Sequence, residues 1–215
     1  KEQSVFFLVD VSQSQHVGKE ENKINISKEI ASVLTISALN TNSQVGILCF
    51  SDQKELFIQS KKGASHGYRI IKNLYELNQK SKKTNISSMI KFFMNMVKKK
   101  SLVILISDFI DKDYDKNMRA LAKKHDVVCL HIYDDYETNI PNLGIIELEE
   151  KENNFRKWVN TSSSSFKKLS DNLFISKPEE LKKKMNAIGI NYLKINSKEN
   201  YVKNLIKLFK YRKKR

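Results

Sequence analysis

The sequence has few of the residues that interrupt regular structure, since its 215 residues include two Pro and six Gly. Linkers between domains concentrate Pro, Gly and Ser, so this scarcity argues against a long flexible linker. There is no visible internal repeat, and no apolar run approaches the roughly 20 residues that a membrane span needs. Because 40% of the residues are hydrophobic, we expect residues 1–215 to form a single domain with its own core.

Cysteine is also scarce, and neither of the two present suggests chemistry. Cys49 and Cys129 lie within apolar runs that predict buried strands, where a free thiol packs as a small apolar side chain. We expect a reduced compartment, the cytoplasm, and no disulfide. No signal peptide is visible. Since the chain begins at Lys1 and not at an initiator Met, we expect a C-terminal fragment of a longer protein. A membrane anchor in the preceding part of that protein is left as an alternative.

Acidic residues are fewer than basic ones. The chain has 24 Asp and Glu and 39 Lys and Arg, which gives a formal net charge of +15. A charge of this size attracts polyanions, so one alternative function is a Lys-rich protein associated with nucleic acid. Only five of the basic residues are Arg. Lys lacks the planar guanidinium that recognises bases and phosphates specifically. We therefore favour a solvated basic surface over a specific nucleic-acid site.

Oxygen-bearing side chains end the first segment that has the pattern of a strand. Residues 5–9 are apolar and β-prone, and Asp10, Ser12 and Ser14 follow at alternate positions. The carboxyl end of a buried parallel strand is where open α/β sheets bind their ligands. A carboxylate with two hydroxyls suits a hard cation such as Mg²⁺ or Mn²⁺. This segment alone would supply half of a metal site.

Two further oxygen ligands stand at predicted element ends far along the chain. Thr84 directly precedes an amphipathic helical pattern over residues 86–98. Asp108 lies two residues after the aliphatic run 102–106, which is typical of a strand buried on both faces. Loops that leave different strands of one sheet can bring such residues together. The candidate ligands of a divalent cation are therefore Asp10, Ser12, Ser14, Thr84 and Asp108.

The rest of the chain alternates predicted strands and helices, the pattern of a doubly wound α/β fold. We expect a mostly parallel central sheet with helices on both faces and one antiparallel edge strand. The predicted strands, the third of which is the edge strand, lie at residues 5–10, 45–51, 54–60, 102–108, 127–133 and 190–195.

The predicted helices lie at residues 27–39, 67–77, 86–98 and 115–124, and begin again at residues 164 and 199. A hairpin is expected over residues 144–159. Pro178 should break or kink the helical sequence that starts at residue 164. Ser176 and Glu179 have the spacing of a capping box that would restart this helix.

The five candidate ligands resemble the metal-ion-dependent adhesion site of von Willebrand factor A domains, which is DxSxS, then a Thr, then an Asp after a later strand. A closer resemblance is to the bacterial domain of unknown function 58 family, which carries such a domain. It rests on VGILCFSD, KTNISS, LVILISDFID, ALAKKHDVVCLHIYDDYE and IPNLGIIELEE, and it covers residues 5–150 with a weaker match through the final helix.

The resemblance implies a von Willebrand factor A-like, Rossmann-type fold and a cation-dependent protein-interaction module rather than an enzyme. Asp10, Ser12, Ser14 and Thr84 would bind the cation directly, and Asp108 directly or through water. Neutral hydroxyl ligands leave much of the ion's charge unneutralised, so an Asp or Glu of a partner protein can complete the octahedral shell. The family suggests a MoxR-type AAA+ ATPase as the partner, in the assembly or maturation of complexes.

The sequence departs from the family pattern beside the site. Gln13 and Gln15 stand where many relatives have Gly and Met, which removes no ligand. Phe109 follows Asp108 where many A domains have Gly. We therefore expect the surface beside the metal to have a different shape, with consequences for the choice of partner.

Two other interpretations compete with this one. A haloacid dehalogenase-type phosphatase also uses an Asp at a strand end, but it needs a second Asp two residues later as acid and base. Here that position is Ser12, whose hydroxyl cannot do this work. The other interpretation is that the five residues only cap loops and satisfy turn amides. It explains any one of them well but all five together poorly.

Overall fold

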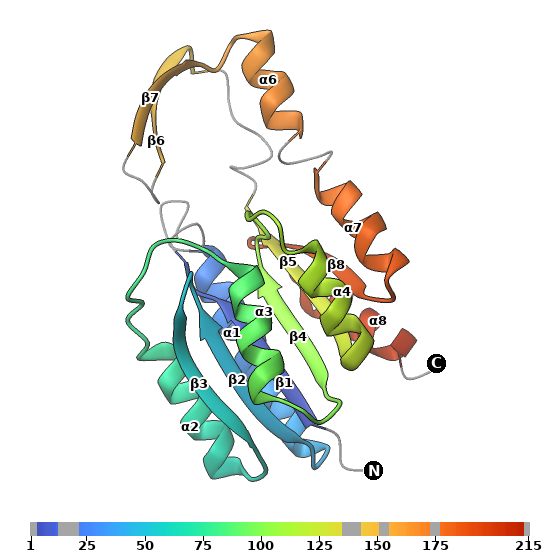
Figure 1. The fold of residues 1–215 in the computed structure, drawn as a ribbon. Helices are drawn as coiled ribbons and strands as arrows, with labels where there is room; N and C mark the ends of the chain where they lie inside the picture. The colour runs from blue at the N-terminus through green and yellow to red at the C-terminus, as the bar shows by residue number, and fades with distance from the viewer. Residues whose placement is uncertain (1–3, 13–21, 135–142, 151–154, 173–176, 213–215) are drawn as a thin grey trace.

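Six strands form one sheet in the order β3-β2-β1-β4-β5-β8 (Figure 1). The computed structural model describes residues 4–12, 22–134, 143–150, 155–172 and 177–212. All neighbouring strands pair in parallel except β2 and β3, which are antiparallel and leave β3 at one edge. The strands are β1 (Ser4–Asp10), β2 (Gln44–Phe50), β3 (Lys54–Lys61), β4 (Leu102–Ser107), β5 (Asp126–Tyr133) and β8 (Asn191–Asn196).

Helices cover both faces of this sheet and divide the core into two layers. One layer packs against α1 (Asn22–Asn40), α2 (Ala64–Tyr75) and α8 (Val202–Arg212). The other packs against α3 (Ile86–Met96), α4 (Asp115–Lys124) and α7 (Lys177–Ala187).

The central strand β1 is buried along its whole length and supplies both layers of the core. Phe7 and Val9 face the layer of α1, whereas Phe6 and Leu8 face the layer of α3. Successive strand residues point to opposite faces, so a strand covered on both sides is apolar at nearly every position. This explains why the uninterrupted run VFFLV predicts an interior strand.

The order of the strands reverses between β1 and β4. From β1 the chain passes through α1 to β2 on one side of β1, and after β3, α2 and α3 it returns to β4 on the other side. Connections that diverge in this way leave a crevice at the carboxyl ends of the two strands. Val9 pairs with Ile106 in the register, so Asp10 and Ser107 end their strands at the same level.

A second sheet of two antiparallel strands, β6 (Ile145–Glu150) and β7 (Phe155–Asn160), lies between β5 and α7 in the sequence. It is followed by α6 (Ser164–Asp171). Figure 1 shows the hairpin and α6 on the side of the molecule toward which the parallel strands point. Trp158 on β7 is 68% exposed.

The expected architecture is confirmed, including the antiparallel edge strand and the hairpin. Several helix boundaries differ from the prediction, whereas the expected interruption before Pro178 is present. The first helix begins at Asn22, five residues early. The last begins at Val202, whose N–H donates to the Asn200 side chain. The helical sequence from residue 164 is interrupted and restarts, as expected: α6 ends at Asp171, and α7 begins at Lys177 with Pro178 in its first turn, where the missing N–H of proline breaks no hydrogen bond.

Two further expectations concern cysteine and the capping box. Cys49 and Cys129 are free and buried, as expected. Ser176, the residue expected to cap the restarted helix, lies outside the described residues. None of the described helices combines the length and the apolar character of a membrane span.

Candidate metal centre

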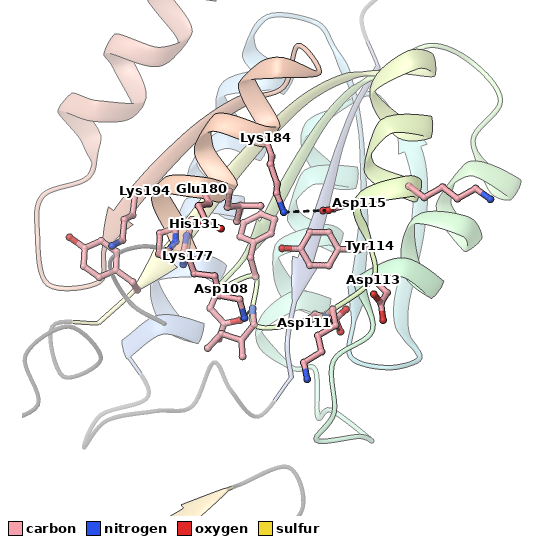
Figure 2. A pocket seen from close by; sticks show the side chains of 17 residues that line it. Asp108, Asp111, Asp113, Tyr114, Asp115, His131, Lys177, Glu180, Lys184 and Lys194 are labelled. Atoms are coloured by element: carbon pink, nitrogen blue, oxygen red, sulfur yellow. Dashed lines mark hydrogen bonds and ion pairs between the residues drawn. The ribbon is translucent and has the colours of Figure 1, made fainter. Parts of the chain in front are cut away.

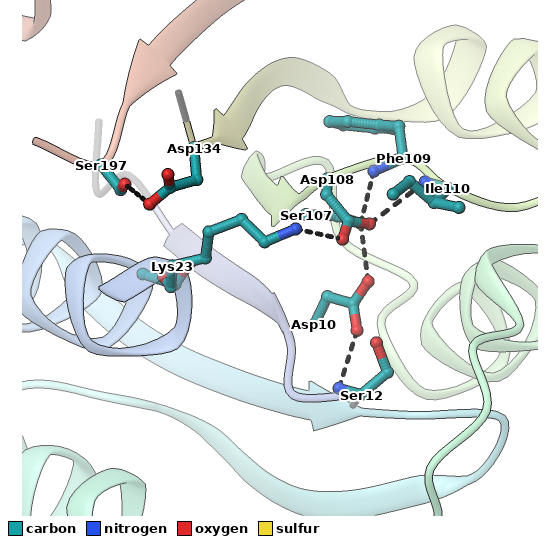
Figure 3. Close-up of polar contacts among 10 residues, drawn as sticks. Asp10, Ser12, Lys23, Ser107, Asp108, Phe109, Ile110, Asp134 and Ser197 are labelled. Carbon is teal, nitrogen blue, oxygen red and sulfur yellow. Dashed lines mark hydrogen bonds and ion pairs between the residues drawn. The ribbon is translucent and has the colours of Figure 1, made fainter. Parts of the chain in front are cut away.

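Asp10 ends β1 with its side chain fully buried. Its Oδ1 accepts a hydrogen bond of 3.0 Å from the backbone N–H of Ser12, and its Oδ2 accepts one of 2.6 Å from the hydroxyl of Ser107 (Figure 3). The first bond is the side-chain turn that Asp forms two residues ahead. Together the two bonds fix the orientation of the carboxylate at the carboxyl end of the sheet. Ser12 is buried in the turn that follows.

Asp108 follows the last residue of β4 and points into the same region (Figure 3). Its Oδ2 lies 3.0 Å from Nζ of Lys23, which comes from the first turn of α1. Its Oδ1 accepts the backbone N–H of Ile110 at 3.1 Å. The side chains of Lys23 and Asp108 are 0% and 1% exposed, so this ion pair is inside the protein.

Ser107 connects these two carboxylate-bearing turns. Its hydroxyl donates to Asp10 and accepts the backbone N–H of Phe109 at 3.0 Å. Because a single hydroxyl serves both segments, the turn after β4 is positioned directly against the end of β1.

Thr84 lies in the loop that leads into α3, and two hydrogen bonds hold this loop at the same end of the sheet. The N–H of Asn85 donates to the carbonyl of Ser51, just beyond β2. The N–H of Ile86 donates to Asp111 Oδ2, in the turn after β4, at 2.7 Å. Since β1 lies between β2 and β4, the loop that contains Thr84 crosses the sheet at the end of β1.

The hydroxyl of Thr84 is buried and has no hydrogen-bond partner among the described residues. Buried hydroxyls without partners are uncommon, because each loses its hydration without compensation. A cation near Asp10 would provide the missing contact for this oxygen.

The carboxylate of Asp10 is in an unfavourable electrostatic environment. Burial and the neighbouring charge of Asp108 raise its pKa from 3.8 to about 7, although the hydrogen bonds from Ser107 and Ser12 act in the opposite direction. A cation in contact with a carboxylate favours its ionised form. A divalent ion at this position would therefore stabilise the ionised form of Asp10.

The donor set fits a hard, oxygen-preferring ion. Asp10, Ser12 and Thr84 could supply one carboxylate and two hydroxyls, and Asp108 a second carboxylate, as Mg²⁺ and Mn²⁺ prefer. Among the described residues there is no cluster of three or more His, Cys, Asp or Glu that could hold a metal, so hydroxyl ligands would be essential. The fifth candidate, Ser14, lies outside the described residues.

Comparison with protein families matches residues 1–173 to the family described as "Protein of unknown function DUF58". The chain belongs to this family. The comparison with curated proteins gave no match.

Solved structures similar to this DUF58 domain include the conserved hypothetical protein BatB from Bacteroides thetaiotaomicron, with a TM-score of 0.57 and 15% identity over 96% of both chains. An aerotolerance-related membrane protein from Bacteroides fragilis has a TM-score of 0.55 and 14% identity over 90% of this chain and 91% of that chain. Proximal thread matrix protein 1 from the mussel byssus has a TM-score of 0.50 and 19% identity over 61% and 38%. At these identities the likeness shows the fold alone, which is von Willebrand factor A-like.

A pocket of about 740 Å³ opens beside Asp108 in this DUF58 domain (Figure 2). Its walls are residues 108–116, the end of β5, Lys194 of β8 and the first half of α7. A volume of this size is typical of sites that take a small molecule or a few side chains of a peptide.

Phe109 forms part of the pocket and has an unusual backbone conformation. Its φ is 56°, in the left-handed region that favours Gly. Its ring packs against those of His131, Tyr114 and Tyr192, with centroids 5.6, 6.4 and 6.3 Å away. The backbone thus has the conformation suited to the Gly found in many A domains, and the Phe side chain fills space beside the site.

His131 lines the pocket together with Asp108, and its environment argues against a role in acid–base catalysis. Its Nδ1 is hydrogen-bonded to the Tyr192 hydroxyl. Burial lowers the pKa of His131 to about 3, so the ring stays neutral. Its position suits a packed aromatic side chain.

Two residues that shape the site, Lys23 and Ser107, were not among the predicted site residues. Ser107 adjoins Asp108 in the sequence, and its place at the strand end was the available signal. Lys23 gave no signal, because a lysine in a helix normally lies in solvent.

Proposed function

We propose that this DUF58 domain is a divalent-cation-dependent protein-interaction module. Asp10, Ser12, Ser14 and Thr84 hold Mg²⁺ or Mn²⁺, and Asp108 contributes directly or through water. When the ion is bound, an Asp or Glu side chain of a partner protein would complete its ligand shell in place of water. No covalent bond of the partner would be broken.

One observation carries this proposal: the buried Asp10 carboxylate lies at the strand-order reversal, beneath a loop whose Thr84 hydroxyl has no hydrogen-bond partner in the described part of the chain. Each feature costs stability in the metal-free protein, because a buried charge without a cation and a buried hydroxyl without a partner are both unfavourable. A cation at this position would remove both costs.

The donor set supports binding in preference to catalysis. The position two residues after Asp10 is a serine, which cannot act as the acid and base of a phosphatase. His131, near Asp108, is neutral and hydrogen-bonded to Tyr192. We therefore infer a module without enzymatic activity, and Asp10-dependent turnover of small phosphoesters would contradict this inference.

The partner and the location rest on family analogy. The resemblance to the family suggests a MoxR-type AAA+ ATPase, so we propose such an ATPase as the partner, acting in the assembly or maturation of complexes in the cytoplasm. We propose that residues 1–215 act as one domain within a longer protein.

Direct titration with Mn²⁺ tests the cation site. We expect the wild-type chain to bind about one Mn²⁺ in calorimetry, and Asp10→Asn to lose at least about tenfold in affinity, because a neutral amide replaces the charged ligand. The control is Asp126→Asn, which removes an acidic residue paired with Arg212 at the opposite end of the sheet. Wild-type protein that binds no Mn²⁺, or Asp10→Asn protein that binds it equally well, would overturn the proposal.

The partner is tested by capture of a co-expressed MoxR-type ATPase in Mg²⁺, with and without EDTA. We expect capture to require Mg²⁺ and Asp10. Binding that ignores EDTA but falls steeply with salt would instead support a Lys-rich surface that binds nucleic acid.

A further inference from the structure

Lys23 has a charged side chain at a buried position, where an apolar side chain would stabilise the fold more. Its side chain is 0% exposed, and it is the second residue of α1, next to the buried Ile24. Its ammonium lies 3.0 Å from Asp108 Oδ2, across 85 residues of sequence. Burying an ion pair of this kind seldom stabilises a protein more than apolar packing would. Stability alone therefore does not explain the ion pair between Lys23 and Asp108, and we relate it to the net charge of the candidate metal centre.

The ammonium of Lys23 changes the net charge of the side chains that surround a cation at this site. Asp10 and Asp108 are the two carboxylates of the candidate metal centre, and Asp10 accepts hydrogen bonds from neutral donors, the Ser12 amide and the Ser107 hydroxyl. Lys23 neutralises Asp108. A divalent ion thus meets a net charge of −1 from these three groups and is repelled by the ammonium.

We propose that Lys23 is a built-in counter-ion of Asp108, which limits the affinity of the site for divalent cations and leaves the charge of a bound ion available to a partner carboxylate. This inference rests on the proposed function. It also assigns a role to Asp108. Because its Oδ2 contacts Lys23 and its Oδ1 accepts the Ile110 N–H, Asp108 meets a cation in competition with the Lys23 ammonium.

The test is the Mn²⁺ affinity of Lys23→Met, which removes the charge and keeps an unbranched apolar chain of similar length. We expect Mn²⁺ to bind about tenfold more tightly or better, because Asp108 is freed and the ammonium is gone. The metal-free variant should melt at a lower temperature and show a larger rise on addition of Mn²⁺. A purely structural role for Lys23 would predict weaker binding.

The matched control is Lys194→Met. Lys194 lines the pocket with Asp108, but its Nζ lies over the ring of Tyr133, 4.2 Å from the centroid. We expect its removal to change the Mn²⁺ affinity by less than about threefold, because the distance and solvent screen its charge.

A second pair of variants covers the case in which Lys23→Met does not fold. Asp108→Asn alone removes this carboxylate and keeps the Lys23 ammonium, so we expect Mn²⁺ affinity to fall at least about tenfold. Adding Lys23→Met to Asp108→Asn should raise the Mn²⁺ affinity again, because the net charge of the site returns to −1, although the contribution of Asp108 stays lost. This double variant contains no buried unpaired charge at the two positions.

The outcomes separate the two proposals. If wild-type protein binds Mn²⁺ through Asp10 but removal of Lys23 leaves the affinity unchanged or weaker in both backgrounds, the role of Lys23 is wrong and the proposed function stands. If neither wild-type nor Lys23→Met protein binds Mn²⁺, the proposed function falls and this inference falls with it.

Discussion

The hydroxyl of Ser107 donates a 2.6 Å hydrogen bond to Asp10 Oδ2 across 97 residues of sequence. The bond joins the ends of two neighbouring parallel strands at the point where the strand order reverses. It holds the carboxylate in one orientation, and it is one of the contacts that lower the pKa of Asp10 against the effect of burial. The geometry of the candidate metal centre thus depends on a side chain that need not touch the cation.

Ser107→Ala should destabilise the protein by about 1–3 kcal/mol, because it leaves Asp10 Oδ2 buried without its donor. We also expect the pKa of Asp10 to rise above its present value, and Mn²⁺ affinity at pH 7 to fall. Urea denaturation and calorimetry measure the two effects. The control is Ser101→Ala at the other end of β4, which loses a hydrogen bond to the Lys99 carbonyl and should leave Mn²⁺ affinity unchanged.

The raised pKa of Asp10 predicts a pH dependence with a definite sign. The folded state binds the proton up to about pH 7, whereas the unfolded chain releases it near 3.8. The contribution to stability is therefore fully present below 3.8 and is lost as the pH rises through 7, with a slope of up to about 1.4 kcal/mol per pH unit. Urea denaturation from pH 4.5 to 8 checks this. Asp10→Asn should give a flatter profile.

The same titration sets the pH dependence of cation binding. Because a proton and Mn²⁺ compete for Asp10, the affinity for Mn²⁺ should rise up to about tenfold per pH unit below 7 and level off above it. A binding constant that stays the same between pH 5.5 and 7.5 would contradict this competition.

Thr84→Val should separate stability from binding. The hydroxyl of Thr84 is buried without a partner among the described residues, so a methyl group in its place should leave the metal-free protein as stable or up to about 1 kcal/mol more stable. Mn²⁺ affinity should fall, because a ligand is lost. Thr35→Val is the matched control: the Thr35 hydroxyl on α1 is also buried without a partner among the described residues, but its loss should not affect Mn²⁺.

Phe109→Gly tests the turn beside the site. Glycine would relieve the left-handed backbone conformation by about 1 kcal/mol, but the loss of a buried ring costs about 3–5 kcal/mol. We expect a net destabilisation of about 2–4 kcal/mol with Mn²⁺ affinity unchanged within about threefold. Thermal unfolding and calorimetry check the two parts. A more stable variant would mean that backbone strain outweighs the packing of the ring.

The fold could be predicted because its strongest signals are local. The runs VFFLV and LVILI are long and apolar enough to indicate strands covered on both faces, and they form β1 and β4. Helix boundaries were less accurate. The interruption expected near Pro178 is present, because α6 ends at Asp171 and α7 begins at Lys177, with the proline in the first turn.

The candidate metal centre could be predicted only where a ligand follows a recognisable strand or precedes a helix, as Asp10, Thr84 and Asp108 do. The remaining contacts depend on tertiary structure. The burial of Lys23 follows from the position of Asp108, 85 residues away, and helical periodicity cannot show it. The bond from Ser107 to Asp10 likewise depends on the register between β1 and β4.

The strands of the small sheet, β6 and β7, pair with each other and not with the six strands of the main sheet. Substitutions, insertions or shortening within residues 143–172 can therefore accumulate during evolution without shifting the register of β5 and β8. This segment projects on the side of the candidate metal centre (Figure 1). The surface of this segment can thus change among related proteins while the candidate cation ligands stay in place.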